Sequence, residues 1–259
     1  MTRLLLFILV ATGCARERAA APPALDDLTH ALFRDWEDDE AMAQHALDLA
    51  DWLGDEGDTD ESWDGMRLTN LAKADVGDVS RPQGTDLDAH AGIATAGPSD
   101  FRVPRHAELL VERDQTWTDP NTFQVYERTV VEGNPDAFAG GTGIVRTDNV
   151  IEKSGAFGIV IPYTLRKDYR WIPGPVPVVV GRTWITEPGC SDNGKNCVNQ
   201  SWGLDVFVGD DDRTLRLYVV WLEVVTEADG LIGEDAKIAL MAKGNQDILE
   251  ATDEELASR

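Results

Sequence analysis

The chain has 259 residues, which is ample for a sizeable core within one large domain. Its 47 acidic and 23 basic residues give a formal net charge of −24. A surface this negative repels phosphate backbones and anionic lipid head groups. The charge therefore excludes nucleic-acid binding and electrostatic attachment to membranes.

The N-terminal segment MTRLLLFILVATGC has the pattern of an export signal: Arg3, a short apolar run, then small residues leading to Cys14. The apolar run is too short to span a bilayer. Its ending Ala-Thr-Gly-Cys resembles the lipobox of bacterial lipoproteins, in which the cysteine is acylated and becomes the mature N-terminus. This resemblance implies a signal peptide over residues 1–13 and a membrane anchor at Cys14. Ala15 stands where an aspartate would favour the inner membrane, so we expect the outer membrane.

The remaining cysteines, Cys190 and Cys197, flank a short polar loop. An even pair in an oxidising compartment predicts a disulfide bond. The rival interpretation is a metal or redox pair, although six intervening residues without a histidine fit neither a zinc site nor a thioredoxin motif.

Residues 14–24 form a tether, and residues 25–104 an acidic helical arm followed by an irregular segment. Between Asp26 and Asp64 there are fifteen acidic residues and one basic residue, Arg34. The apolar positions of residues 25–53 recur at helical spacing. We therefore expect helices whose outer side is charged and whose inner stripe packs on the main domain. For residues 54–104 we expect loops with short helices or strands, including a helix near 66–74.

From residue 105 the pattern changes to strands, separated by turn residues. They are expected at 122–132, 143–152, 156–166, 176–187, 201–208 and 214–226. Residues 209–213 give the strongest hairpin signal of the chain. The last strand is apolar on both faces, whereas a strand wetted on one side alternates. Each face is therefore covered, or one face lines an apolar cavity.

The chain ends in a predicted helix over residues 234–256. The segments Ala228-Asp-Gly-Leu-Ile-Gly233 and Lys237-Ile-Ala-Leu-Met-Ala-Lys-Gly-Asn resemble the end of START-type lipid-transfer domains, of the helix-grip superfamily that includes Bet v 1-like proteins. The resemblance implies an α+β fold over residues 105–259: a curved antiparallel sheet wrapped on a long C-terminal helix, with the acidic helical arm in front. It also implies a cavity for an apolar molecule between sheet and helix.

We expect large aromatic and charged side chains of the strands to line this cavity. Tryptophans in the strands equally suit a packed core, and a carboxylate in an apolar strand equally suits a salt bridge at the sheet edge. The candidate cavity residues are Trp184, Trp202, Trp221, Tyr218, Arg182 and Glu223.

No catalytic or metal motif is present in the sequence. The four histidines lack metal-ligand spacing, and there is no nucleophile elbow or phosphate loop. We therefore expect no cofactor, no metal and no catalytic residue. The predicted function is a cell-envelope lipoprotein that binds or carries a hydrophobic small molecule or lipid. The alternatives are a packed-core structural lipoprotein whose acidic arm contacts a cationic protein, and a cyclase- or hydrolase-like enzyme.

Overall fold

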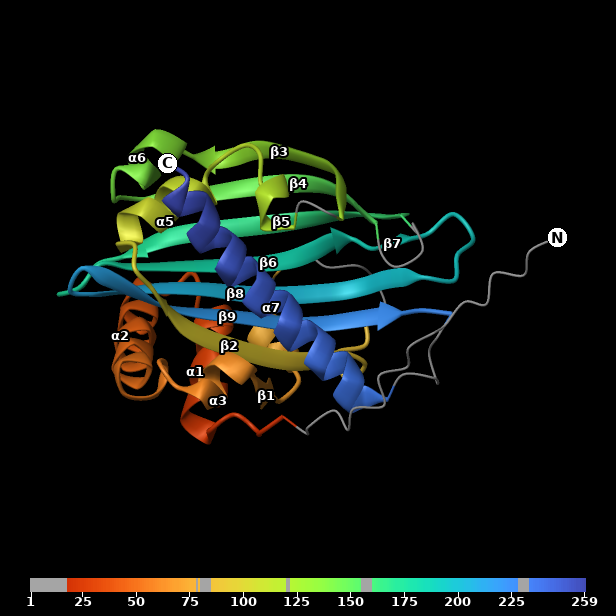
Figure 1. The fold of residues 1–259 in the computed structure, drawn as a ribbon, viewed down its shortest axis with the longest axis horizontal. Coiled ribbons are helices and arrows are strands. Elements are labelled where there is room, and N and C mark those ends of the chain that lie inside the picture. Colours follow the sequence, from red (N-terminus) through yellow and green to blue (C-terminus); the bar gives the residue numbers. More distant parts are fainter. Residues whose placement is uncertain (1–17, 78, 80–84, 120–121, 155–159, 228–232) are drawn as a thin grey trace.

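The computed structural model describes residues 18–77, 79, 85–119, 122–154, 160–227 and 233–259. The predicted signal peptide and Cys14 lie outside these residues. In the described residues, nine strands form one antiparallel sheet in the order β1-β2-β9-β8-β6-β5-β4-β3, with β7 paired to β8 (Figure 1). The strands are β1 (Met66–Leu68), β2 (Ala91–Ser99), β3 (Phe123–Gly133), β4 (Ile144–Ser154), β5 (Val160–Ile172), β6 (Val178–Glu187), β7 (Gly189–Cys190), β8 (Cys197–Asp210) and β9 (Arg213–Val225).

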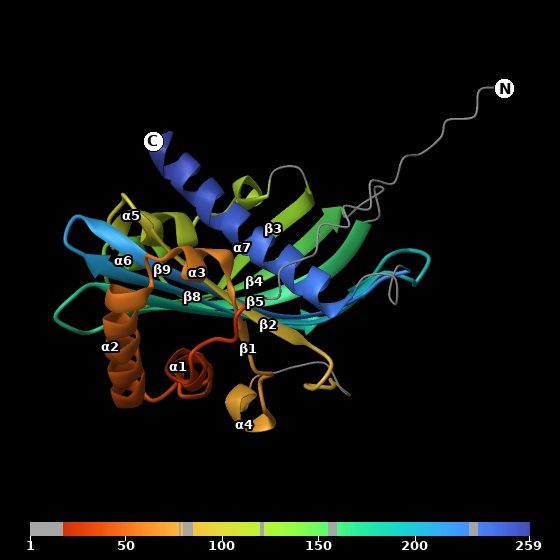
Figure 2. The ribbon, with the colours of Figure 1, turned by 60° about the horizontal axis from the view of Figure 1, so that its bottom comes forward.

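The helices cover both faces of this sheet. They are α1 (Pro23–Arg34), α2 (Asp39–Glu56), α3 (Asp60–Asp64), α4 (Lys73–Val76), α5 (Val103–Leu110), α6 (Pro135–Ala139) and α7 (Glu234–Ala257), with a 3-10 turn η1 (Thr116–Thr118). Figure 2 shows α7 on one side of the sheet and α1, α2 and α4 on the other. We call these sides the α7 face and the arm face. Among the helices in the described ranges, none combines the length and apolar character needed to cross a bilayer.

The predicted α+β fold is confirmed, since α7 lies across a large antiparallel sheet whose far strands β3 to β5 rise beside it (Figures 1 and 2). Helix α7 is held to the sheet by apolar and polar contacts. Ile238 and Ala242 pack against Ile93 of β2. Near the C-terminal end, Arg216 of β9 donates to both carboxylate oxygens of Asp253, at 3.0 and 2.9 Å.

The arm packs as the sequence predicts. Its expected inner stripe is buried: Leu25, Leu32, Trp36, Met42, Ala46, Leu49 and Leu53 are fully covered and belong to one core cluster with the arm face of β6, β8 and β9. The acidic run 37–40 marks the break between α1 and α2. There Asp38 accepts from the backbone N–H groups of Glu40 and Ala41 and so caps α2.

The sheet begins earlier than residue 105, which corrects the predicted boundary. Strands β1 and β2 form its edge, and residues 66–74 hold β1 and the start of α4 instead of one helix. The sequence of β2, AGIATAGPS, has few large residues to signal a strand. Its glycines are required by large neighbours, because a Cβ on Gly92 would lie 2.4 Å from Cδ1 of Trp221.

The turn between β8 and β9 and the disulfide bond are both confirmed. Strands β8 and β9 pair down to Asp210 and Arg213, and Asp211 adopts the left-handed conformation that a two-residue hairpin turn needs. Cys190 and Cys197 are bonded through sulfur where β7 pairs with β8.

The burial of the arm predicts a large difference between two leucine truncations. Leu49→Ala on α2 removes a side chain with no exposure, and we expect it to lower the free energy of unfolding by about 2–5 kcal/mol. The matched control is Leu240→Ala on α7, where the side chain is 65% exposed; its expected cost is within about 0.5 kcal/mol. Urea unfolding measures both. Equal costs would mean that the arm does not pack on the sheet.

Candidate ligand cavity

A cavity of about 720 Å³ lies between the α7 face of the sheet, α7 and the η1 turn. This volume is within the range of small-molecule pockets. Most of its wall is apolar and comes from β3, β4, β5, β8, β9 and α7. The apolar lining residues are Phe123, Ile151, Ile161, Leu165, Val198, Val220, Leu222, Val224, Leu240 and Ile248.

One group of polar side chains in this cavity lies where β5, β6, β8 and β9 are side by side. Lys167 lies opposite Thr183, and Asp205 lies opposite Tyr218 in the next row of the sheet. All four line the cavity. In the described part of the chain, no hydrogen bond or ion pair is made by the Lys167 ammonium, the Asp205 carboxylate or the Tyr218 hydroxyl.

Asp205 is the most unusual group of the cavity because it is a carboxyl that is only 8% exposed. Burial raises its pKa from the ordinary value near 3.8 to about 6, and the positive charge of Lys167 opposes this rise. Burial, together with the nearby charge of Asp205, also raises the pKa of the Tyr218 hydroxyl, which therefore stays protonated. The cavity thus holds a carboxyl that changes charge near neutral pH.

The two ends of the cavity differ. Two residues beyond Lys167 and Asp205, the side chains of Tyr169 and Phe207 join a packed cluster that also contains Phe138. This cluster closes the polar end. Toward the other end, Val224 and Leu240 line the cavity, and Leu240 is largely exposed. We define these as the closed end and the mouth.

The three predicted cavity tryptophans have their side chains on the opposite face. Trp184, Trp202 and Trp221 lie next to one another across β6, β8 and β9, and all three belong to the core beneath the arm. The ring of Phe33 meets Trp202 and Trp221 edge-on, with centroids 5.8 and 6.5 Å apart. Trp202 borders the cavity, but its indole packs under the arm. The core alternative is therefore the one found.

The predictions for the two charged residues, Arg182 and Glu223, are also wrong. Tyr218, in contrast, has its side chain on the cavity side of the sheet, as predicted. Arg182 lies on the arm face, 4.7 Å from the ring centre of Trp36, with its guanidinium 3.3 Å from Asp168. Glu223 accepts hydrogen bonds from Asn199 and Gln200, at 2.7 and 2.8 Å. Successive side chains of a strand point to opposite faces. Arg182 is next to Thr183, which lines the cavity from β6, and Glu223 is next to Leu222, which lines it from β9, so both side chains lie on the other face.

A serine, a histidine and an aspartate also come together, under the C-terminal half of α7. The Ser99 hydroxyl donates to Asp253 at 2.5 Å and lies 3.1 Å from His106 Nε2. In a nucleophilic triad the carboxylate orients the histidine from its other nitrogen. Here it contacts the serine, and in the described residues His106 Nδ1 has no partner. Burial and then Arg216 lower the pKa of His106 to about 3. The cluster anchors α7 and does not reach the cavity.

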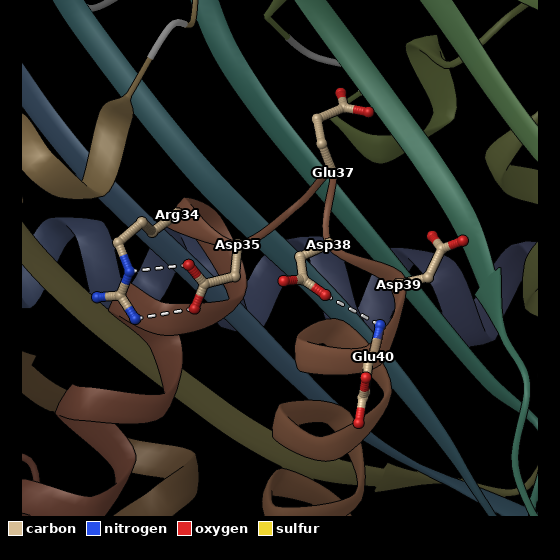
Figure 3. A pocket seen from close by; sticks show the side chains of 6 residues that line it. All are labelled: Arg34, Asp35, Glu37, Asp38, Asp39 and Glu40. Atoms are coloured by element: carbon tan, nitrogen blue, oxygen red, sulfur yellow. Dashed lines mark hydrogen bonds and ion pairs between the residues drawn. The ribbon is translucent and has the colours of Figure 1, made fainter.

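A second, shallow depression lies at the turn between α1 and α2, lined by Arg34, Asp35, Glu37, Asp38, Asp39 and Glu40 (Figure 3). Four of its five carboxylates, those of Asp35, Glu37, Asp38 and Asp39, have partners within the chain. Asp35 pairs with Arg34 and Asp38 caps α2, as Figure 3 shows, while Glu37 lies 2.8 Å from Arg146 and Asp39 pairs with Arg170 of the sheet. Across the described ranges, no group of three or more His, Cys, Asp or Glu is arranged to hold a metal ion.

No protein-family model matches the chain, and no curated protein matches its sequence. Solved structures do match. The protein TTHA0849 from Thermus thermophilus is 15% identical, with a TM-score of 0.45 over 64% of this chain and 97% of its own. A STAR-related lipid transfer protein from Xanthomonas axonopodis is 8% identical, with a TM-score of 0.44 over 69% and 99%. The Zhui aromatase/cyclase from Streptomyces is 14% identical, with a TM-score of 0.41 over 66% and 95%.

The raised pKa of Asp205 predicts a pH-dependent gain in stability when its charge is removed. The folded carboxyl titrates near 6 and the unfolded one near 3.8, so ionisation opposes folding progressively as the pH rises between these values. Asp205→Asn should therefore raise the free energy of unfolding by about 1–2 kcal/mol at about pH 8, and the gain should vanish near about pH 4.

Urea unfolding across this pH range tests the expectation. Asp51→Asn, at an exposed position of α2, makes the same change in net charge and is the control. A gain that is independent of pH, or equal in the control, would show that the Asp205 carboxylate is not destabilised by burial.

Proposed function

We propose that this protein binds or carries a hydrophobic small molecule, such as a single-chain lipid, in the cavity beneath α7. The observation that supports the proposal is the apolar wall, built from five strands and one helix around a volume of about 720 Å³. Removing the apolar surface of a ligand from water contributes about 25 cal/mol per Å², so an apolar wall of this extent favours an apolar occupant.

The packed-core alternative has less support, because the space between sheet and α7 is only partly filled. The interaction alternative relies on free negative charge along the arm, but the acidic run 37–40 is largely engaged in ion pairs and a helix cap.

Native mass spectrometry of the purified full chain is the direct test of ligand binding. A molecule that co-purifies, and that solvent extraction removes, supports the carrier function. Fluorescent apolar probes should then bind to the extracted protein. Repeated absence of any extractable molecule, together with no response to such probes, contradicts the proposal.

A variant that fills the cavity should abolish this binding. Thr183 lies on the cavity wall between Lys167 and Gly203, and its hydroxyl makes no hydrogen bond within the described part of the chain. We expect Thr183→Phe to weaken binding of a fluorescent naphthylamine probe about tenfold or more, because its ring occupies the volume the probe needs. Thr183→Val removes the hydroxyl at unchanged volume and should keep the affinity. Probe titration, with the melting temperature as a check on folding, decides between them.

Asp205 favours a second candidate function, an enzyme that acts on the bound molecule. A buried carboxyl with a pKa of about 6 is suited to general acid–base chemistry near neutral pH. If the protein is an enzyme, an extracted ligand returned to it should change in mass, and Asp205→Asn should stop that change. A carrier returns the ligand unaltered.

We further propose that the protein is a cell-envelope lipoprotein anchored through Cys14, in the outer membrane. The support is the N-terminal sequence pattern alone. Cys14→Ser should abolish labelling by radioactive palmitate and release the protein from the membrane fraction, since the acyl chains are the attachment. A double variant at Cys190 and Cys197 lacks the disulfide bond and should remain in the membrane. Unchanged fractionation of Cys14→Ser would overturn the anchor.

A further inference from the structure

The closed end of the cavity holds a positive charge that the protein leaves without a counter-ion in contact. Lys167 lines the cavity, and no carboxylate among the described residues is within ion-pair distance of its ammonium. A cation placed in an apolar surrounding costs free energy unless it is paired. A bound group that supplies negative charge would remove this cost.

The other cations of this face are already engaged. Lys153, nearer the mouth, lies 2.8 Å from the Asp119 carboxylate. Arg128 of β3 donates to Asn149, to the Tyr126 hydroxyl and to the backbone oxygens of Leu110 and Glu112. Lys167 is therefore the cation of the cavity that is available to a ligand.

Several hydrogen-bond donors face the space around Lys167. Its ammonium has three N–H groups, and the hydroxyls of Thr183 and Tyr218 face the same space. The charged acceptor among these groups is Asp205, which lies opposite Gly181 of β6 and Tyr218 of β9 in the sheet. The raised pKa of Asp205 means that the positive charge of Lys167 does not compensate its burial. The two groups interact by charge, but in the described part of the chain no ion pair joins them.

We infer that the ligand is a single-chain amphiphile with an anionic head group, such as a carboxylate, and that it enters head-first. This inference rests on the proposed binding function. The head lies against Lys167, Thr183 and Tyr218 at the closed end, and the apolar tail extends along Leu165, Val220 and Leu222 toward Leu240 at the mouth. Because the surface carries a net charge of −24, the recognition of an anion here is local to the cavity.

The test compares three probes that share one tail: tetradecanoate, tetradecanol and tetradecylamine, each displacing a bound naphthylamine fluorophore from the full chain. We expect the acid to bind about tenfold more tightly than the alcohol, the change expected for one charge-assisted hydrogen bond. Lys167→Met should remove this preference, because it weakens binding of the acid much more than binding of the alcohol. Asp205→Asn should keep or strengthen binding of the acid.

The matched control is Lys243→Met, which makes the same change in net charge on the exposed side of α7, away from the cavity. It should keep the preference for the acid. Equal affinity for acid and alcohol in the unmodified chain, or an unchanged preference in Lys167→Met, overturns the inference and leaves the binding function standing. Tightest binding of the amine, lost in Asp205→Asn, assigns the site to a cation and also overturns it. If no probe binds, the proposed function and the inference fail together.

Discussion

The structure depends on a sheet that is apolar on both faces. In β9, Leu215, Leu217 and Val219 face the arm, while Val220 and Leu222 face α7. Neither face can be left in water, so two separate layers cover them. The arm covers one face with two long helices, but the other receives a single long helix. A helix with its side chains is about 10 Å wide, and strands are about 4.8 Å apart, so α7 covers about two strands at any point. The cavity lies in the remaining space on this face, between α7 and the strands that α7 does not pack against.

The packed core on the arm face of the sheet supports the strands that form the cavity wall. The row of Trp184, Trp202 and Trp221 fills the space beneath Phe33 and Trp36, so the strands that line the cavity are supported from behind. Ion pairs from the α1–α2 turn to Arg146 and Arg170 hold the arm in place at one end. The tryptophans therefore contribute to ligand binding indirectly, by positioning β6, β8 and β9.

The side chains of the cavity itself were the hardest to predict. In β8, the odd-numbered positions Ser201, Gly203 and Asp205 are small or polar, a pattern typical of a face in water. The even-numbered positions carry Trp202, Leu204 and Val206, a pattern typical of a core. Each pattern correctly describes the residues of its own face of β8. The polar positions nevertheless line an enclosed space, because α7 lies over them, and for that reason Asp205 has a raised pKa.

The sequence by itself determined many of the features that depend on local order along the chain. It predicted the apolar stripe of the arm, the strands of the second half, the hairpin at residues 209–213, the disulfide bond and α7, because periodicity, turn residues and cysteine spacing are local properties. It also showed that each face of β9 is covered or that one of them lines an apolar cavity. Only the tertiary structure decided which layer covers which face, since two apolar faces look alike in sequence. That choice placed Tyr218, Lys167 and Asp205 in the cavity and the tryptophans in the core. It also brought β2, with almost no strand signal of its own, to the sheet, because only there do its small residues meet the large side chains of Trp63 and Trp221.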